Sequence, residues 1–326
     1  MDILNKAVIT YDCIKASVDV TEKELADFSV EKGDILFQRS SETLEDVGRA
    51  NVYMDDKTAV FGGFVIRGKK KGEYDPQYFN YLLRSPFARK RIIPMGAGAQ
   101  HFNIGQEGLS KVKLHFANIE EQKKIGKMLS LLDERISTQN KIIDKLQSLI
   151  KGIAQKIVRC NKPNVRLSEC LECKSSTLQE SDVYEQGTYP VYGANGIVGY
   201  LDNYNTEGEA VYIIKDGSGV GTVSYVTGKC SATGTLNTLQ AKEGYSLQYL
   251  YYLLKVFNFE PYKTGMAIPH IYFKDYGKAK VFCPSYTEQL QYARLLSAID
   301  NKLSIEQNIL TELTLQKQCF LRQMFI

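Results

Sequence analysis

The chain carries few residue patterns of the kind that perform chemistry, and each of them departs from a working site. Gly63–Lys70 comes within one residue of a phosphate-binding P-loop, but Lys70 stands where a magnesium-binding Ser or Thr is needed. Gly72 and Pro76 follow, so no helix starts there to complete a phosphate site. Gly217–Gly221 has the spacing of neither a nucleophile elbow nor a dinucleotide-binding loop, and it predicts a tight turn between strands.

Metal sites and methyl-transfer motifs are equally poorly supported. Cys170 and Cys173 form a single CxxC pair with no second pair and no nearby histidine, which argues against zinc. We expect His101 and His270 at matching positions of an internal repeat, so they are not ligands of one site unless the two halves touch. No two consecutive prolines occur, so the motif of amino-group methyltransferases is absent. The sequence therefore predicts a chain that is not an enzyme and holds no metal or cofactor itself.

The composition is that of a globular protein with room for two domains. The chain has 326 residues and a net charge of +4, which is compatible with nucleic-acid binding but does not require it. Seven cysteines, an odd number, suggest reduced thiols and a cytoplasmic location, and no apolar run or signal segment points to a membrane. Much of the positive charge falls in two clusters, Arg67, Lys69, Lys70 and Lys71, and Arg84, Arg89, Lys90 and Arg91.

The sequence repeats itself at a spacing of 167 residues. A Glu-Gln pair at Glu121 and again at Glu288 opens a long segment in which Leu-Ser and aliphatic-Asp steps recur at the same offsets. Such a spacing is too long for a solenoid unit and indicates a duplicated module, each copy with a globular part followed by a long helix. A protein built in this way is expected to recognise two things at once.

Both long segments have the four-three spacing of apolar residues that is typical of a coiled coil. Gln139 and Glu306 interrupt the two stripes at the same repeat position, and we interpret them as a polar pair that sets the register. The stripes extend for about four heptads, roughly 50 Å of helix, which favours pairing of one helix with the other over packing on a single domain. Their members are Ile125, Leu129, Leu132, Ile136, Gln139, Ile143, Leu146, Ile150, Ile153 and Ile157, and Tyr292, Leu296, Ile299, Leu303, Glu306, Leu310, Leu313, Lys317, Phe320 and Met324.

The globular halves have the mixed patterns of α+β domains. Tyr78–Leu83 and Tyr249–Leu254 predict short amphipathic helices, and turns at Gly33 and Gly208 each precede a buried strand. A glycine-containing loop ending in histidine follows in each half, and strands are expected at residues 111–114 and 278–281. We therefore divide the chain into a first domain (1–117), a first long helix (118–160), a second domain (161–284) and a second long helix (285–326).

Together, the Tyr189–Tyr204 stretch and the two helices led by Glu-Gln resemble the specificity subunits of type I restriction-modification enzymes. The resemblance implies two target-recognition domains, each on one half of a split double-stranded DNA site, and two antiparallel coiled-coil helices related by a pseudo-twofold repeat. It further implies methyltransferase (modification) and motor-nuclease (restriction) subunits as partners. S-adenosylmethionine, ATP and magnesium would be bound by those partners.

Within this resemblance, loop residues with hydrogen-bonding side chains are the candidates for contact with DNA. We expect the two contacts to fall about one helical turn apart, on the order of 34 Å, with the coiled coil as a ruler between them. The candidates for phosphate contact are Lys69, Lys70, Arg89 and Lys90. The candidates for base contact are Arg39, Ser40, Ser41, Gln100 and His101 in the first domain, and Lys215, Ser218, Lys263, Thr264 and His270 in the second.

The first half departs from this pattern at its start. Only 32 residues precede Gly33, whereas 43 residues precede Gly208 when counted from Val165, so we expect the opening strands of the first domain to be shortened or missing. An internal start at Met1 would explain this, and a silent or truncated recognition cassette is one alternative function. A second alternative is a protein-protein adaptor with duplicated arms, whose coiled coil forms between two chains.

Overall fold

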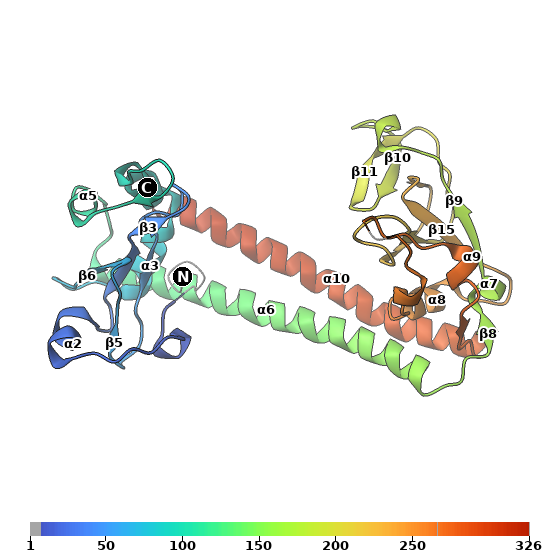
Figure 1. The fold of residues 1–326 in the computed structure, drawn as a ribbon, viewed down its shortest axis with the longest axis horizontal. Coiled ribbons are helices and arrows are strands. Elements are labelled where there is room, and N and C mark those ends of the chain that lie inside the picture. The colour runs from blue at the N-terminus through green and yellow to red at the C-terminus, as the bar shows by residue number, and fades with distance from the viewer. Residues whose placement is uncertain (1–7, 266, 326) are drawn as a thin grey trace. The chain divides into compact units, whose positions relative to one another are not determined.

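The computed structural model describes residues 8–265 and 267–325, and the chain divides into two compact units. The first unit comprises Met1–Asn140 and Asn308–Ile326, and the second comprises Lys141–Gln307. Both boundaries fall inside long helices, α6 (Ile119–Arg159) and α10 (Tyr286–Gln323). Each unit therefore holds one globular domain, the start of the helix that follows it and the end of the other helix (Figure 1).

The first domain is built on a three-stranded antiparallel sheet of order β4-β2-β6. The domain also has two separate two-stranded pairs, β1–β5 and β3–β7. Its elements are η1 (Tyr11–Cys13), α2 (Glu22–Phe28), β1 (Ser29–Val30), β2 (Ile35–Gln38), β3 (Ser40–Ser41), β4 (Ala50–Val52), β5 (Ala59–Val60), β6 (Val65–Gly68), α3 (Pro76–Arg84), α4 (Pro86–Ile92), η2 (Ile93–Met95), β7 (Phe102–Asn103) and α5 (Gln106–Ser110).

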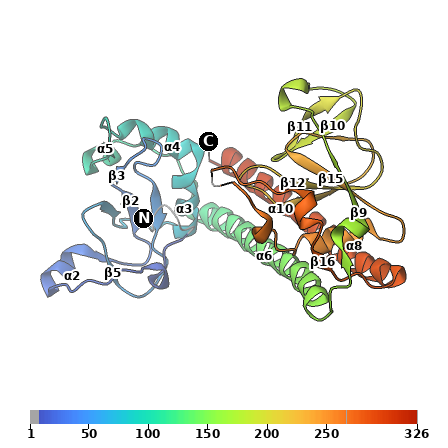
Figure 2. The same cartoon turned by 45° about the vertical axis from the view of Figure 1, so that its right-hand side comes forward.

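The second domain has a four-stranded sheet of order β13-β12-β15-β9, a separate sheet of order β11-β10-β14 and the pair β16–β8 (Figure 2). Its elements are β8 (Val165–Arg166), α7 (Leu167–Cys170), β9 (Leu171–Ser175), η3 (Glu180–Asp182), β10 (Tyr189–Gly193), β11 (Gly196–Leu201), β12 (Ala210–Ile214), β13 (Val223–Val226), β14 (Ser231–Ala232), β15 (Leu236–Ala241), α8 (Leu247–Leu254), η4 (Glu260–Tyr262), α9 (Phe273–Tyr276) and β16 (Lys280–Val281).

The two domains share a three-stranded sheet followed by a short helix, as the repeat predicts, and we call this common part the frame. Strands β4-β2-β6 correspond to β13-β12-β15, and a short helix, α3 or α8, follows each set along the chain. Gly33 and Gly208 adopt φ of 94° and 82° in the turns before β2 and β12, a conformation that glycine adopts without strain. The strands that precede this frame differ between the domains. In the second domain β8, β9, β10 and β11 come before β12, whereas among residues 8–34 of the first domain no strand has the pairing of any of these four.

One predicted strand is wrong. Residues 111–114 form no strand, although the matching strand in the second domain, β16, pairs with β8 through Val281 and Val165. In the described part of the first domain no segment takes the place of β8, so the backbone at 111–114 has no ladder to join. Val112 and Leu114 nevertheless pack on the buried cluster beneath α4, which explains why the alternating pattern is present.

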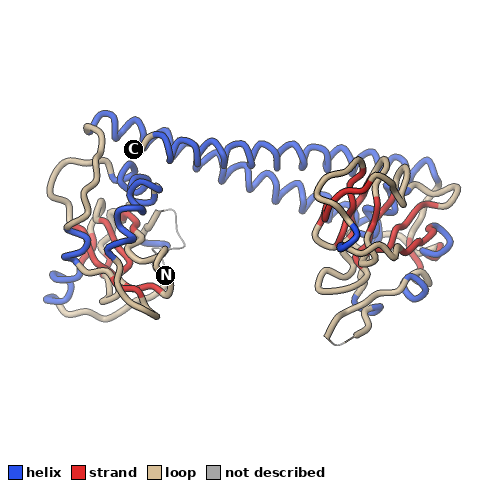
Figure 3. Tube along the Cα trace, turned by 90° about the horizontal axis from the view of Figure 1, so that it is seen from above, coloured by secondary structure: helices blue, strands red, loops and turns tan. Residues whose placement is uncertain are grey.

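The long helices pair along the predicted stripes. All twenty stripe positions are buried or half-buried, including Gln139 and Glu306 with exposed fractions of 8% and 6%. In the first unit Leu129 and Leu132 of α6 pack with Leu313 of α10, and within each unit the two helices run side by side in opposite directions (Figures 1 and 3). The pairing therefore takes place within one chain, which confirms the predicted antiparallel helices.

Candidate nucleic-acid interface

Each domain is attached to the start of its own long helix by the glutamine of the repeated Glu-Gln pair. In the first unit Gln122 accepts a hydrogen bond from the backbone N–H of Asp75 at 3.0 Å and donates one to the carbonyl of Ala117 at 2.6 Å. In the second unit Gln289 makes the same two bonds, with Ser246 N–H and Pro284 O, both at 2.9 Å.

Both glutamines are only 2% exposed, and both bind the residue that caps a short helix. Asp75 caps α3 by accepting from Tyr78 N–H, and Ser246 caps α8 by accepting from Tyr249 N–H. The glutamine thus ties the N-terminus of the short helix to the first turn of the long helix in each unit. We refer to Gln122 and Gln289 below as the clamp glutamines.

The first domain brings all five of its predicted base-reading residues to one edge. Strand β3 pairs with β7 through Ser40 opposite Asn103 and Ser41 opposite Phe102. Arg39 precedes β3, and its carbonyl accepts from Ile104 N–H at 2.9 Å. Gln100 and His101 are exposed on the loop that leads into β7. The side chains that could reach a base therefore come from two neighbouring loops.

The second domain assembles an equivalent edge. Asp216 follows the short connection from β12, and its backbone pairs with His270, which pairs in turn with Thr264. Lys215 lies next to this ladder because its carbonyl accepts from Ile271 N–H at 2.9 Å, and Ser218 is exposed in the adjoining turn. Thr264 and His270 are thus part of this edge, and Lys215 and Ser218 flank it.

The fifth residue, Lys263, precedes Thr264 but is engaged elsewhere. Its ammonium forms an ion pair with Glu260 at 2.6 Å. The pair joins residues three apart at η4 and lies partly in solvent, with 29% of the lysine side chain exposed. Lys263 therefore reaches DNA only if it gives up a weak surface contact.

The ladder corrects one feature of the predicted repeat. The sequence suggested that His101 matches His270, but Asn103 occupies the position of His270, since Asn103 pairs with Ala97 as His270 pairs with Thr264. The two loops have the same length from the glycine that turns them, Gly98 in the first domain and Gly265 in the second. The predicted alignment was based on the histidines because the two loops otherwise differ in composition and each contains one histidine.

The two ladders also carry a side-chain bond at the same place. In the first domain the Ser40 hydroxyl donates to Asn103 Oδ1. In the second, His270 Nδ1 lies 2.6 Å from Asp216 Oδ1. Asn103 and Asp216 were not among the predicted site residues, and only the strand pairing reveals them.

The four predicted phosphate contacts divide into two groups. Lys69, Lys70 and Lys90 are exposed, with Lys70 Nζ 5.7 Å from the centre of the Tyr74 ring. Arg89 instead donates to the carbonyls of Glu45 and Val47 at 2.8 and 2.7 Å, and burial lowers its pKa to about 10. This guanidinium holds the loop before β4 in place, which argues against its binding a phosphate.

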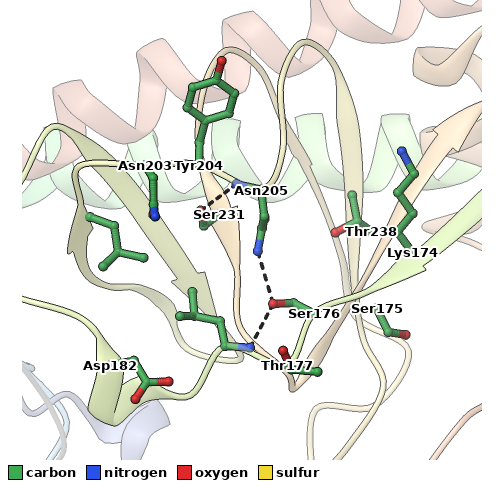
Figure 4. A pocket seen from close by; sticks show the side chains of 12 residues that line it. Lys174, Ser175, Ser176, Thr177, Asp182, Asn203, Tyr204, Asn205, Ser231 and Thr238 are labelled. Carbon is green, nitrogen blue, oxygen red and sulfur yellow. Dashed lines mark hydrogen bonds between the residues drawn. The ribbon is translucent and has the colours of Figure 1, made fainter.

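A polar pocket of about 580 Å³ lies in the second domain between β9 and the β11-β10-β14 sheet (Figure 4). Asn205 crosses it and donates to Ser176 Oγ at 3.2 Å and to the Ala232 carbonyl at 3.1 Å. Ser176 Oγ also accepts from Leu178 N–H at 3.1 Å. Asn205 therefore links the segment that follows β9 to β14 of the other sheet.

The described residues contain no group of three or more His, Cys, Asp or Glu side chains placed to hold a metal ion. Cys170 lies beside Cys283, with the two sulfurs 3.8 Å apart, and not beside Cys173. Among the same residues, no helix combines the length and the apolar character that crossing a bilayer requires.

Known proteins similar to this chain are specificity subunits. A putative type I specificity subunit of Mycoplasma genitalium is 25% identical over 281 residues, which cover 78% of this chain and 71% of that protein. A putative type I restriction enzyme specificity subunit of Methanocaldococcus jannaschii is 31% identical over 143 residues, 43% of this chain and only 33% of that relative.

The fold and the family agree with these relatives. The crystal structure of a type I restriction-modification S subunit from M. genitalium superposes with a TM-score of 0.64 at 20% identity, covering 92% of this chain and 84% of that one. The relatives are named for specificity and not for catalysis, in agreement with the prediction that this chain is not an enzyme. The sequence profile of the type I restriction modification DNA specificity domain matches residues 2–148 and 162–315, and the chain belongs to that family.

Proposed function

We propose that this chain is the DNA sequence-recognition subunit of a type I restriction-modification complex and reads a site in two halves. The proposal rests on the pairing of two loops at one edge of each domain. In each domain the loop after the central strand and the glycine-turned loop meet in one ladder. The frame is the same in both domains but the side chains on it differ, as expected for two readers of two different short sequences.

The polar groups on these edges suit the major groove. Arg39 and Gln100 offer bidentate donors and acceptors for guanine and adenine, and each good pair discriminates by about 1–3 kcal/mol. Ser41 in the first domain, and Lys215, Ser218 and Thr264 in the second, supply further single contacts. Lys69, Lys70 and Lys90 would bind phosphates, which adds salt-dependent affinity without sequence choice.

The partners follow from the family. Methyltransferase subunits would dock on the paired helices, where exposed charged residues such as Lys141, Asp144 and Lys145 flank the buried stripe. S-adenosylmethionine would come with those subunits, and ATP and magnesium with a motor-nuclease subunit. In this arrangement the length of the paired helices sets the number of unread bases between the two half-sites, and the complex works in the cytoplasm.

Methylome sequencing of cells with and without this gene tests the proposal directly. We expect one bipartite methylated motif that disappears with the gene. Insertion of one heptad into both α6 and α10 is expected to lengthen the gap between the two halves and to leave the halves themselves unchanged. A motif that keeps its gap after the insertion would show that the helices are not the ruler.

Binding measurements with and without the methyltransferase partner separate the roles of individual residues. Gln100→Ala is expected to relax sequence choice, whereas Lys70→Ala is expected to lower affinity equally for all sequences and to reduce the salt dependence. Lys151→Ala, which removes one exposed charge from α6, is the matched control. If the chain shows no salt-sensitive DNA affinity with or without its partner, a protein-protein adaptor is the better description.

A further inference from the structure

His270 is held through both its backbone and its side chain. Its backbone bonds Thr264 in both directions, at 2.7 and 2.9 Å. Its Nδ1 lies 2.6 Å from Asp216 Oδ1, and its ring stacks on Tyr272 at 6.5 Å between centroids and 21° between planes. The side chain still exposes 35% of its surface to solvent.

The bond to Asp216 decides what the other ring nitrogen offers. A carboxylate only accepts hydrogen bonds, so the proton of the neutral imidazole lies on Nδ1. The other nitrogen, Nε2, is then an acceptor. In the major groove the donors that an acceptor can read are the amino groups of adenine N6 and cytosine N4.

The equivalent position in the first domain offers the opposite chemistry. Asn103 Oδ1 accepts from Ser40, which leaves its Nδ2 amide as the group that donates. That amide lies 3.3 Å from the His101 carbonyl and is exposed with its residue, so it has a second hydrogen for a base. Acceptors for it in the major groove are purine N7, guanine O6 and thymine O4.

We propose that residues 103 and 270 are matching specificity determinants, one in each domain, and that Ser40 and Asp216 are their positioning residues. Held by Asp216, His270 reads an exocyclic amino group in the half-site of the second domain. Held by Ser40, Asn103 donates to a base acceptor in the other half-site. The inference rests on the proposed function. It adds, for one contact in each half-site, whether the protein donates or accepts the hydrogen bond.

Base analogues in the recognised duplex test the contact of His270. Each adenine or cytosine of one half-site is replaced in turn by the base that lacks its amino group, purine or 2-pyrimidinone, and affinity is measured for each duplex. In the wild-type complex one replacement should weaken binding about tenfold, corresponding to about 1.4 kcal/mol. In His270→Ala the same replacement should have no effect.

Variants of Asp216 separate positioning from folding. Asp216→Asn keeps an oxygen that can accept from Nδ1–H, so most of the analogue penalty should remain. Asp216→Ala frees the ring, and the penalty should fall to about twofold while selectivity at the other half-site is unchanged. That unchanged half-site shows that the chain is folded, because it is read by the first domain of the same molecule.

Conversion of one pair into the other completes the test. Asp216→Ser combined with His270→Asn should replace the amino-group contact by sensitivity to 7-deazapurine or to loss of a carbonyl acceptor at the same base pair. An analogue penalty that survives in His270→Ala, or a preference for guanine that disappears only in that variant, would overturn the inference for His270. Should the wild-type complex bind no DNA, the proposed function itself fails, and that result is distinct from the absence of one base contact.

Discussion

The two domains cover the same sheet in different ways. In the first domain, the face of the sheet that points away from α3 is covered by residues 9–30, and Ile9 and Val30 pack on Leu36. An apolar pocket of about 380 Å³ remains open there, beside Val18 and Phe28. In the second domain the β11-β10-β14 sheet covers this face, with Tyr192 packed on Tyr212.

The edges used for reading are alike in spite of this difference. Ser40–Asn103 and Asp216–His270 both lie on a ladder formed by loops from the frame, and no described residue of the covering layer takes part in either ladder. The layer on the sheet therefore varies independently of the reading loops. Only the frame and its attachment to the long helix have to be kept, and four sets of substitutions test that conclusion.

Substitution of the clamp glutamines should have the largest effect on stability, and the effect should be equal in both units. Gln122→Ala leaves the Asp75 N–H and the Ala117 carbonyl without their partner, and Gln289→Ala does the same to Ser246 and Pro284. Each orphaned group costs about 1–3 kcal/mol, so we expect a loss of about 3 kcal/mol in the unit that carries the change. Urea unfolding with amide exchange of α3 and α8 measures it.

Gln291→Ala, an exposed change on α10, is the control for the clamp variants and should be nearly neutral. A large loss in one unit and a small loss in the other would show that the two attachments are not the same device.

A second attachment should be stronger in the first unit than in the second. Asp133 accepts from Tyr81 at 2.7 Å and forms an ion pair with Lys317 of α10. Its counterpart Asp300 accepts from Tyr252 at 3.3 Å, and Lys255 is 3.9 Å away. Asp133→Ala should therefore cost about 2 kcal/mol and Asp300→Ala about 1 kcal/mol. Thermal unfolding of the two variants gives the order, and equal losses would contradict the geometric argument.

The turning glycines should show a moderate effect that is local to each reading edge. A Cβ on Gly98 would collide with the His101 carbonyl, and one on Gly265 with the carbonyl of Ile268, and both glycines have positive φ. Alanine at either position should cost about 1–2 kcal/mol and relax base choice in one half-site only. Gly228→Ala, with φ of 85° and open space around its Cβ, supplies the backbone strain without the collision. Base choice relaxed by this control would remove the loop geometry from the explanation.

Much of this architecture follows from periodicity. The four-three spacing through Leu129 and Leu132 predicts the helix pairing because it requires only that one stripe be covered. The strand at residues 111–114 failed because pairing depends on a partner far away in sequence, which periodicity does not report. The structural contacts of Arg89 were missed for the same reason: its carbonyl partners at Glu45 and Val47 lie more than forty residues earlier.

The reading edge was only partly predictable. Exposed polar residues on glycine-containing loops identified Ser40 and His270, but their partners Asn103 and Asp216 lie 63 and 54 residues away. An aspartate before Gly217 also looks like an ordinary turn residue, which hides its bond to the histidine. Sequence reasoning thus locates the loops, whereas the polarity of each contact depends on which side chains meet across them.

The smallest effect should come from making the two units alike at one stripe position. Lys317 occupies the repeat position of Ile150, which is 5% exposed in the second unit. Lys317→Ile removes the ion pair with Asp133 but adds apolar surface to a stripe that is otherwise apolar, so net stability should change by less than about 1 kcal/mol. The informative quantity is the coupling between the two positions. Asp133→Asn should cost less in the Lys317→Ile background than in the wild type, by about 1 kcal/mol in a double-mutant cycle of thermal unfolding. Purely additive losses would mean that Asp133 acts through Tyr81 alone, and that the two units attach their domains to the helices in the same way.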